Sequence, residues 1–181
     1  PKNIIELANL RIDVRTFTQW LLADQKLRVG RLDGRYTSAA PDGFMEPGTF
    51  DPSSAATQGP FTAVFNDYVR RELKWTSELH YEVSGNVRPW EQAQPGEPAE
   101  ALRSALTRDG FTKLLVVCGY YDLATPFNGI EHTVSHMSLE PPIRKNVSFT
   151  YYEAGHMMYL REPDLVALKN NVAQFIATTS R

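Results

Sequence analysis

The 181-residue sequence has little of several things that would assign it to a class at once. It holds one cysteine, Cys118, so an internal disulfide is impossible. Its longest apolar runs fall well short of the roughly 20 residues that a membrane-spanning helix needs. A net charge of −2 argues against nucleic acid or an anionic membrane as a partner. The 42% hydrophobic content is that of an ordinary globular chain with one substantial core.

Two chemical patterns are missing as well. No serine has a glycine two residues before it and two residues after it, so the G-x-S-x-G turn of a hydrolase nucleophile is absent. His132 and His136 have the spacing of helical metal ligands, but the glutamate of H-E-x-x-H is missing and no third ligand is evident. We therefore expect neither a metal nor another cofactor.

The chain changes character near residue 95. Residues 1–95 are irregular and mainly helical, with helical spacing in 4–12, 14–27 and 60–75. A proline-rich stretch over 38–60 predicts a long loop, and the alternation over 79–85 is compatible with a strand. A glycine-punctuated turn, "GRLDGR", contains Arg31, Asp33 and Arg35, which we interpret as a structural ion-pair turn in preference to a substrate contact.

The pattern of residues 96–181 is more regular. "TKLLVVCGYYD" and "NVSFTYYEAG" are apolar, strand-like segments, and helical patterns precede, separate and follow them. This α-β-α-β-α order predicts an α/β fold with parallel strands. The first strand is almost continuously apolar, which is typical of a strand buried on both faces. Because two strands make a poor sheet, we expect further strands to come from elsewhere.

Two polar residues follow these strands. Asp122 comes after the first and His156 after the second, 34 residues later. The carboxyl ends of parallel strands share one edge of a sheet, so the two loops should be neighbours. An aspartate there can accept the imidazole N–H, fix the tautomer and stabilise the imidazolium. Alone, Asp122 could be a turn former and His156 a structural histidine; together they predict an acid–base pair.

The segments "GYYDLATP" and "YEAGHMMY" resemble the catalytic Asp and His segments of the serine carboxypeptidase family, especially its bacterial members. The matching positions are Gly119, Asp122 and Pro126 in the first segment, and Ala154-Gly155 before His156 in the second. Upstream, "LRVGRLDGRYT", "FDPS" and "FNDYVRRELKW" are similar to the region that leads out of that family's helical cap. The resemblance covers most of the chain and is weaker before residue 60.

The resemblance implies the C-terminal portion of an α/β-hydrolase fold, with residues 1–95 as late cap and connector and 96–181 as core. It implies removal of C-terminal residues from peptides by a Ser-His-Asp triad, with Asp122 and His156 as catalytic residues. Met157 would line the leaving-group pocket, or else pack in the core. The resemblance favours a secreted or periplasmic location.

The serine itself would lie outside these residues. In the family it is carried by the N-terminal half, and this sequence starts at Pro1 in what looks like the late cap. We expect the partner to be the N-terminal half of the same enzyme, on a second chain or a removed segment, or alternatively self-association. Esterase or acyl-transfer chemistry on the same scaffold and a non-catalytic fragment remain alternatives.

Overall fold

A computed structural model describes residues 12–40, 50–79, 81 and 96–179. The chain forms two compact units, each described separately below: residues 1–31 with 35–91, and residues 32–34 with 92–181. The described residues are of mixed helix and strand, 53% helical and 12% strand, and include a small parallel sheet. This composition agrees with the α/β class that the sequence predicts. Among the described residues, no helix is both long enough and apolar enough to cross a membrane.

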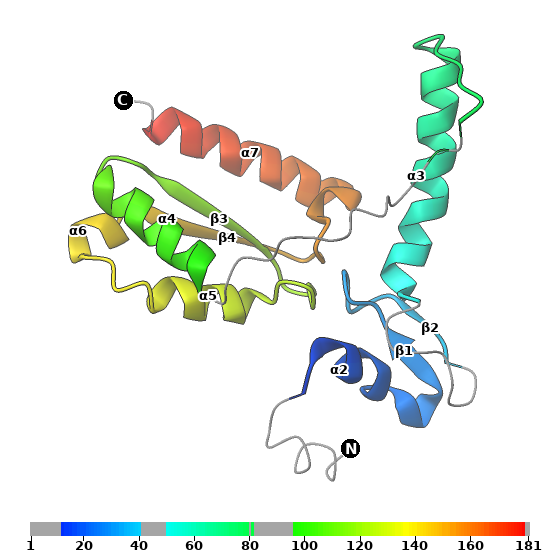
Figure 1. Ribbon diagram of the computed structural model, residues 1–181, viewed down its shortest axis with the longest axis horizontal. Coiled ribbons are helices and arrows are strands. Elements are labelled where there is room, and N and C mark those ends of the chain that lie inside the picture. Colours follow the sequence, from blue (N-terminus) through cyan, green and yellow to red (C-terminus); the bar gives the residue numbers. More distant parts are fainter. Residues whose placement is uncertain (1–11, 41–49, 80, 82–95, 180–181) are drawn as a thin grey trace. The chain divides into compact units, whose positions relative to one another are not determined.

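The described part of the first unit combines the short helix α2 and the long helix α3 with an antiparallel strand pair (Figure 1). In chain order its elements are α2 (Val14–Trp20), the 3-10 turn η1 (Ala23–Gln25), β1 (Leu27–Val29), β2 (Thr37–Ala39) and α3 (Pro52–Arg71). Aspartates cap both main helices: Asp13 accepts hydrogen bonds from the amides of Arg15 and Thr16, and Asp51 accepts one from the amide of Ser54. Such caps satisfy amides that the first helical turn leaves unpaired.

Two expectations for this unit were wrong in detail. The helix predicted over 14–27 ends at Trp20. Leu27, the last residue of the predicted range, belongs to β1. The loop predicted over 38–60 ends at Asp51, because this residue caps α3 and Pro52 occupies the first turn, where proline is tolerated. The helix expected over 4–12 and the strand expected over 79–85 lie almost wholly outside the described residues.

The second unit follows the predicted α-β-α-β-α order. Its elements are α4 (Glu97–Arg108), β3 (Leu114–Gly119), α5 (Phe127–Ser135), α6 (Pro141–Arg144), β4 (Val147–Tyr152), η2 (Met158–Leu160) and α7 (Glu162–Thr179). Strands β3 and β4 are parallel, with a register that runs from Leu114 opposite Val147 to Gly119 opposite Tyr152. The sequence did not indicate α6, which is a single turn entered through two prolines.

Helices lie on both faces of this strand pair (Figure 1). Successive side chains of a strand point to opposite faces of the sheet. Tyr151 and Tyr152, the last two residues of β4, therefore face different helices. The hydroxyl of Tyr151 donates a hydrogen bond to Glu131 of α5, whereas Asn171 of α7 donates one to the hydroxyl of Tyr152. On the α5 side, Tyr151 also stacks on Tyr120 at a centroid distance of 5.6 Å.

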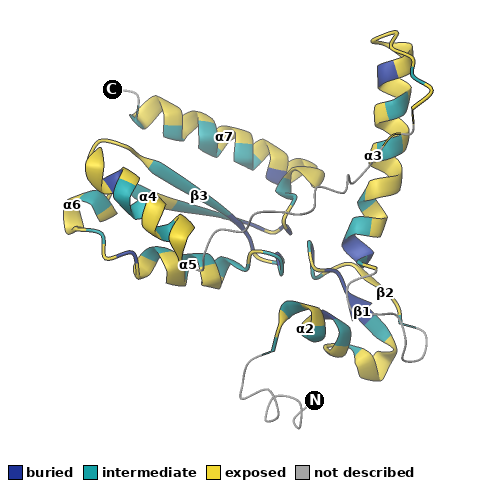
Figure 2. Ribbon diagram, in the orientation of Figure 1, coloured by how far each residue is buried: buried dark blue, intermediate teal, exposed yellow. Residues whose placement is uncertain are grey.

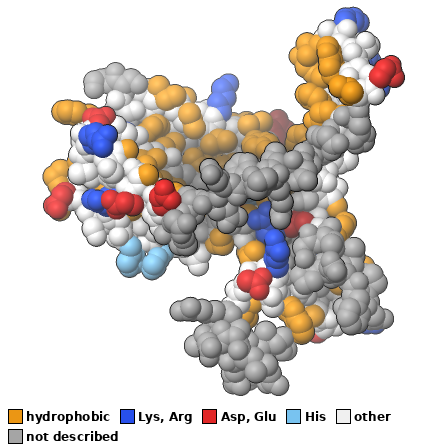
Figure 3. Space-filling model, viewed as in Figure 1, with side chains coloured by type: hydrophobic (Ala, Val, Ile, Leu, Met, Phe, Trp, Pro, Cys, Tyr) orange, Lys and Arg blue, Asp and Glu red, His pale blue; other side chains and the backbone are white. Residues whose placement is uncertain are grey.

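The predicted burial of β3 on both faces was wrong for most of its length. Its first four residues are half-buried, and it is fully buried only at Cys118 and Gly119 (Figure 2). Hydrophobic side chains gather over the strands and α7 of this unit (Figure 3). Within the described part of the chain the sheet has two strands. The described residues therefore leave the apolar side chains of β3 only partly covered.

Candidate functional site

Backbone hydrogen bonds continue to join the two segments beyond the carboxyl ends of β3 and β4. The amide of Tyr120 donates to the carbonyl of Tyr152, and the amide of Tyr121 donates to the carbonyl of Ala154, each at 3.0 Å. The parallel pairing therefore continues into both loops. This continuation brings Asp122 and His156 to the same edge of the sheet, as the sequence predicts.

The close approach of the two loops depends on glycine at position 119. A Cβ atom built there would lie 2.5 Å from the carbonyl oxygen of Ala154 and closer still to that of Gly155. Backbone atoms cannot yield to such a contact as the end of a flexible side chain could. Position 119 thus needs glycine because another backbone lies where a side chain would be.

Asp122 and His156 are hydrogen-bonded to each other. The Nδ1 atom of His156 lies 2.8 Å from Oδ2 of Asp122, a distance typical of a charge-assisted hydrogen bond. An ionised carboxylate only accepts hydrogen bonds, so this geometry places the proton of the neutral imidazole on Nδ1. The Nε2 atom is then left with a lone pair.

Donors surround the Asp122 carboxylate. Its Oδ1 atom accepts hydrogen bonds from the amides of Ala124 and Thr125, at 2.7 and 2.9 Å, and Oδ2 accepts one from the Thr125 hydroxyl at 2.6 Å. Burial by itself raises the pKa of this carboxyl. The hydrogen bonds from Thr125, His156 and Ala124 outweigh burial and lower the pKa of Asp122 below its ordinary value. Asp122 is therefore ionised at neutral pH.

The two side chains differ in their exposure. The side chain of Asp122 is 6% exposed, whereas that of His156 is 44% exposed. All ring hydrogen bonds of His156 to described residues use Nδ1: one joins it to Asp122, and a longer one, at 3.3 Å, joins it to the Thr125 hydroxyl. The imidazole is thus held through Nδ1 while much of its side chain remains exposed, which leaves Nε2 without a hydrogen-bond partner among the described residues.

Met157 lies directly after the histidine and is half-buried. Its carbonyl accepts a hydrogen bond from the amide of Leu160 and so begins η2. This turn fixes the backbone that leaves the histidine loop. A place for Met157 in a leaving-group pocket stays a prediction.

Sequence reasoning missed two contributors to the site. Thr125 stands three residues after Asp122, a spacing at which a hydroxyl and its amide can both bond to an aspartate, so the signal was present. The second contributor is the segment Leu32–Gly34, which groups with the second unit although the rest of that unit begins only at Gln92. No periodicity or motif in the sequence indicated that these residues contact the loops of Asp122 and His156.

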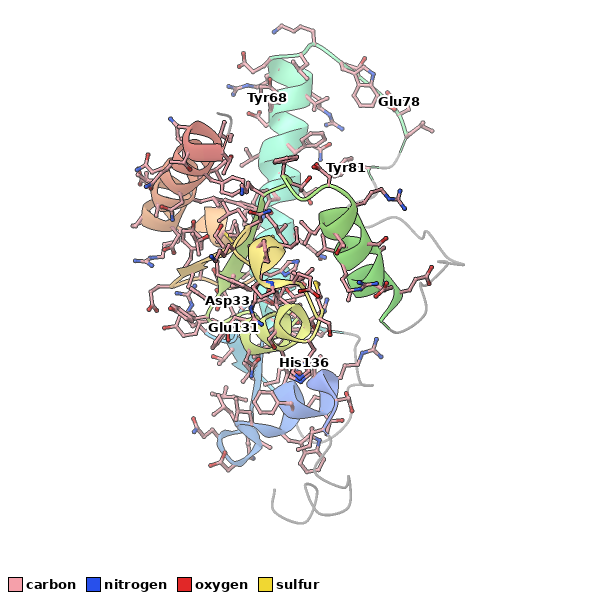
Figure 4. All side chains as sticks on the ribbon, turned by 90° about the vertical axis from the view of Figure 1, so that its left-hand side faces the viewer. Asp33, Tyr68, Glu78, Tyr81, Glu131 and His136 are labelled. Atoms are coloured by element: carbon pink, nitrogen blue, oxygen red, sulfur yellow. The ribbon has the colours of Figure 1, made fainter. Side chains whose placement is uncertain are left out.

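The other candidate residues, His132, His136 and Cys118, have different surroundings from those of Asp122 and His156. His132 of α5 and His136, which caps the C-terminus of that helix, are both exposed and stack at 3.9 Å (Figure 4 labels His136). Within the described ranges, no cluster of three or more His, Cys, Asp or Glu side chains could hold a metal ion. Cys118 is buried, and burial, together with the nearby Glu131 and Asp122 charges, raises the pKa of its thiol. A raised thiol pKa disfavours the thiolate that nucleophilic attack requires.

Comparison of the chain with protein-family models, with curated proteins and with solved structures found no match. The geometry of the site therefore carries the functional argument, beside the resemblance of its motifs.

Proposed function

We propose that this chain supplies the acid and base of a serine-type carboxypeptidase. Asp122 and His156 would be two members of a Ser-His-Asp triad that hydrolyses C-terminal peptide bonds. The second unit would then be the C-terminal portion of an α/β-hydrolase core. Esterase or acyl-transfer chemistry would use the same triad, so it remains the alternative, and a substrate panel on the complete enzyme would separate it from peptidase activity.

One observation carries the proposal: the 2.8 Å contact between Nδ1 of His156 and Oδ2 of Asp122. Three further donors hold the carboxylate, so its orientation does not depend on the histidine alone. The side chain of His156 is 44% exposed, and its ring hydrogen bonds to described residues all use Nδ1. A general base needs this arrangement, with one nitrogen oriented by a fixed acceptor and the other free to accept a proton.

In the proposed reaction, a serine hydroxyl attacks the carbonyl carbon of the last peptide bond. Nε2 of His156 accepts the hydroxyl proton as the new C–O bond forms. The imidazolium then donates this proton to the nitrogen of the leaving amino acid as the C–N bond breaks. Water then attacks the acyl carbon while Nε2 accepts its proton, and the imidazolium returns this proton to the serine oxygen as the acyl C–O bond breaks and frees the shortened peptide. Asp122 stays ionised throughout and stabilises the imidazolium by charge and hydrogen bond.

The serine would come from a polypeptide segment outside the 181 residues. The half-buried apolar residues of β3 support this idea, because such a strand is typical of the interior of a larger parallel sheet. Among the described residues, no serine hydroxyl contacts the His156 ring. The proposed partner is the N-terminal half of the same enzyme, with self-association as the alternative.

A fluorophosphonate probe tests the proposal, because it forms a covalent bond with activated serines. The protein would be purified under native conditions, treated with the probe and examined by intact-mass spectrometry of every chain present. We expect an adduct on a serine outside residues 1–181 and no adduct in a His156→Ala variant. His136→Ala is the matched control and should label normally.

Labelling that survives His156→Ala would contradict the proposed role of His156. Absence of any adduct in a preparation that contains the N-terminal half would contradict a serine hydrolase of any kind. After a positive result, a panel of peptides with blocked N-termini and of simple esters would separate peptidase from esterase chemistry.

A further inference from the structure

The segment Leu32–Gly34 bonds to both loops that carry the candidate acid and base. The backbone amide of His156 donates to the carbonyl of Leu32 at 2.6 Å. The backbone amide of Gly34 donates to the carbonyl of Tyr121, the residue before Asp122, at 2.8 Å. Three consecutive residues thus connect the backbone of the histidine to the backbone beside the aspartate.

The contact between this segment and the histidine loop is tight as well as hydrogen-bonded. A Cβ atom built on Gly155 would lie 2.5 Å from Cβ of Asp33 and 2.7 Å from its Cγ, and nearer still to the carbonyl oxygen of Leu32. Asp33 is 8% exposed. Position 155 needs glycine because the segment occupies the space beside it, which is a requirement of packing.

The segment meets the aspartate loop with ordinary van der Waals spacing. A Cβ atom on Gly34 would lie 3.4 Å from Cδ1 of Leu123 and 3.5 Å from the carbonyl oxygen of Tyr121. Both are normal contact distances. Substitution at Gly155 should therefore disturb the arrangement far more than substitution at Gly34.

We propose that Leu32–Gly34 is a positioning strap for the acid–base pair. By bonding the amide of His156 it fixes the backbone from which the imidazole projects, and by bonding Tyr121 it fixes the turn that carries Asp122. The two loops then keep the separation that allows the Nδ1–Oδ2 hydrogen bond. The strap residues are positioning residues, because the hydrogen bonds given above join them to the backbone of the two loops and not to reacting atoms.

This inference deepens the proposed function, since it concerns the same pair, but its consequence can be observed without serine or substrate. Held by Asp122, the His156 imidazole should carry its proton on Nδ1. An unconstrained imidazole places most of its neutral-state proton on Nε2. The ¹⁵N chemical shifts of the two ring nitrogens distinguish these tautomers directly. The spectrum of a His156→Gln variant identifies the His156 signals among the four histidines.

The principal variant is Gly155→Ala, which places a methyl group against Leu32 and Asp33. Its matched control is Gly129→Ala, because a Cβ at Gly129 meets nothing within 4 Å. We expect the wild-type chain and Gly129→Ala to show the Nδ1–H tautomer and slow exchange of the His156 amide. Gly155→Ala should shift His156 towards the Nε2–H tautomer and accelerate exchange of that amide at least tenfold.

Two further variants keep the test decisive if Gly155→Ala fails to fold. Asp33→Ala removes the carboxyl group, whose Cγ lies beside Gly155, and should shift the tautomer in the same direction by a smaller amount. Leu106→Val weakens the packing of α4, away from the strap, and should leave the His156 tautomer unchanged. Folding of each variant is checked by its melting temperature.

The strap is overturned if Gly155→Ala or Asp33→Ala folds with the wild-type tautomer and the wild-type exchange rate. It is equally overturned if Leu106→Val shifts the tautomer as much as the strap variants do, since the effect would then be general loosening. A strap effect combined with no fluorophosphonate adduct in the complete protein would instead overturn the peptidase and leave the strap standing.

Discussion

Two close pairs of side chains in the described part of the second unit contain histidine, and they differ in nearly every respect that matters for chemistry. Asp122 and His156 come from two loops. Asp122 is buried, and three donors besides the histidine hold its carboxylate. His132 and His136 come from one helix, stack at 3.9 Å and are both exposed. The comparison teaches that fixed surroundings, more than the presence of histidine, make a group suitable for directed proton transfer.

The largest effect should come from removing the charge at the first pair. Asp122→Asn keeps the shape but turns an acceptor into a group that can donate, which favours the wrong imidazole tautomer. We expect kcat of the complete enzyme to fall by about 10⁴-fold. Asp164→Asn is the control, because Asp164 is also buried and ion-paired, with Arg161 at 3.0 Å. Comparable losses in both variants would show that any buried aspartate of this unit matters equally.

The second prediction concerns acid stability. The pKa of Asp122 is lower in the folded chain than its ordinary value of 3.8. The stability linked to its ionised form is therefore complete above about that pH, and it is lost as pH falls through the lower, folded-state value. Urea unfolding between pH 2 and 5 should show this loss in the wild type and a weaker pH dependence in Asp122→Asn. An identical slope in the two proteins would contradict the assignment.

Thr125 offers a finer adjustment of the same carboxylate. Thr125→Val removes the hydroxyl that donates to Oδ2 at 2.6 Å, whereas Thr125→Ser keeps it. The pKa of Asp122 should rise in the valine variant and change little in the serine variant, because a donor favours the charged form. Titration of the Asp122 side-chain carbonyl ¹³C signal measures both. Equal pKa values in the two variants would show that the hydroxyl has no role.

A smaller effect is expected at Tyr151, on the side of the strands that faces α5. The hydrogen bond to Glu131, followed by partial burial, raises the pKa of Tyr151 to about 12. Glu131→Gln replaces the charge with a neutral acceptor and should bring this pKa back towards 10. Tyrosine absorbance titration checks it, with Tyr151→Phe identifying the transition. An unchanged transition would mean that Glu131 does not hold the phenol.

The second pair itself should give the smallest effect. His136→Gln removes one of the stacked rings, and we expect no change in the activity of the complete enzyme and less than about 0.5 kcal/mol in stability, as is usual for an exposed position. Activity assays and urea unfolding measure the two quantities. A loss of activity comparable to that of Asp122→Asn would reverse the comparison between the pairs.

The sequence predicts the strand-end pair because the relevant signals are local. Apolar runs mark β3 and β4, and their parallel pairing brings Asp122 and His156 to one edge without any knowledge of distant contacts. Burial along β3 was overestimated, because it depends on which elements cover the strands. The start of α3 at Pro52 was not predicted, because the prolines of this segment are typical of a loop. The helix begins there because Asp51 caps it and proline is tolerated in the first turn.

The contact of Leu32–Gly34 with the histidine loop could not be predicted in this way. It joins residues about 120 positions apart through backbone atoms, and backbone hydrogen bonds leave no mark on residue type. The one trace in the sequence is glycine at position 155. Glycine after alanine and before histidine is compatible with many turns, so its reason becomes clear only when the neighbouring segment is located.

The central claim is that His156 acts as the base of a serine peptidase. The most direct measurement is release of the C-terminal amino acid from an N-blocked dipeptide by the complete enzyme, compared between wild type and His156→Gln at matched concentrations of folded protein. The account predicts steady release by the wild type and a fall of at least 10³-fold in the variant. Release at the wild-type rate by His156→Gln would contradict it.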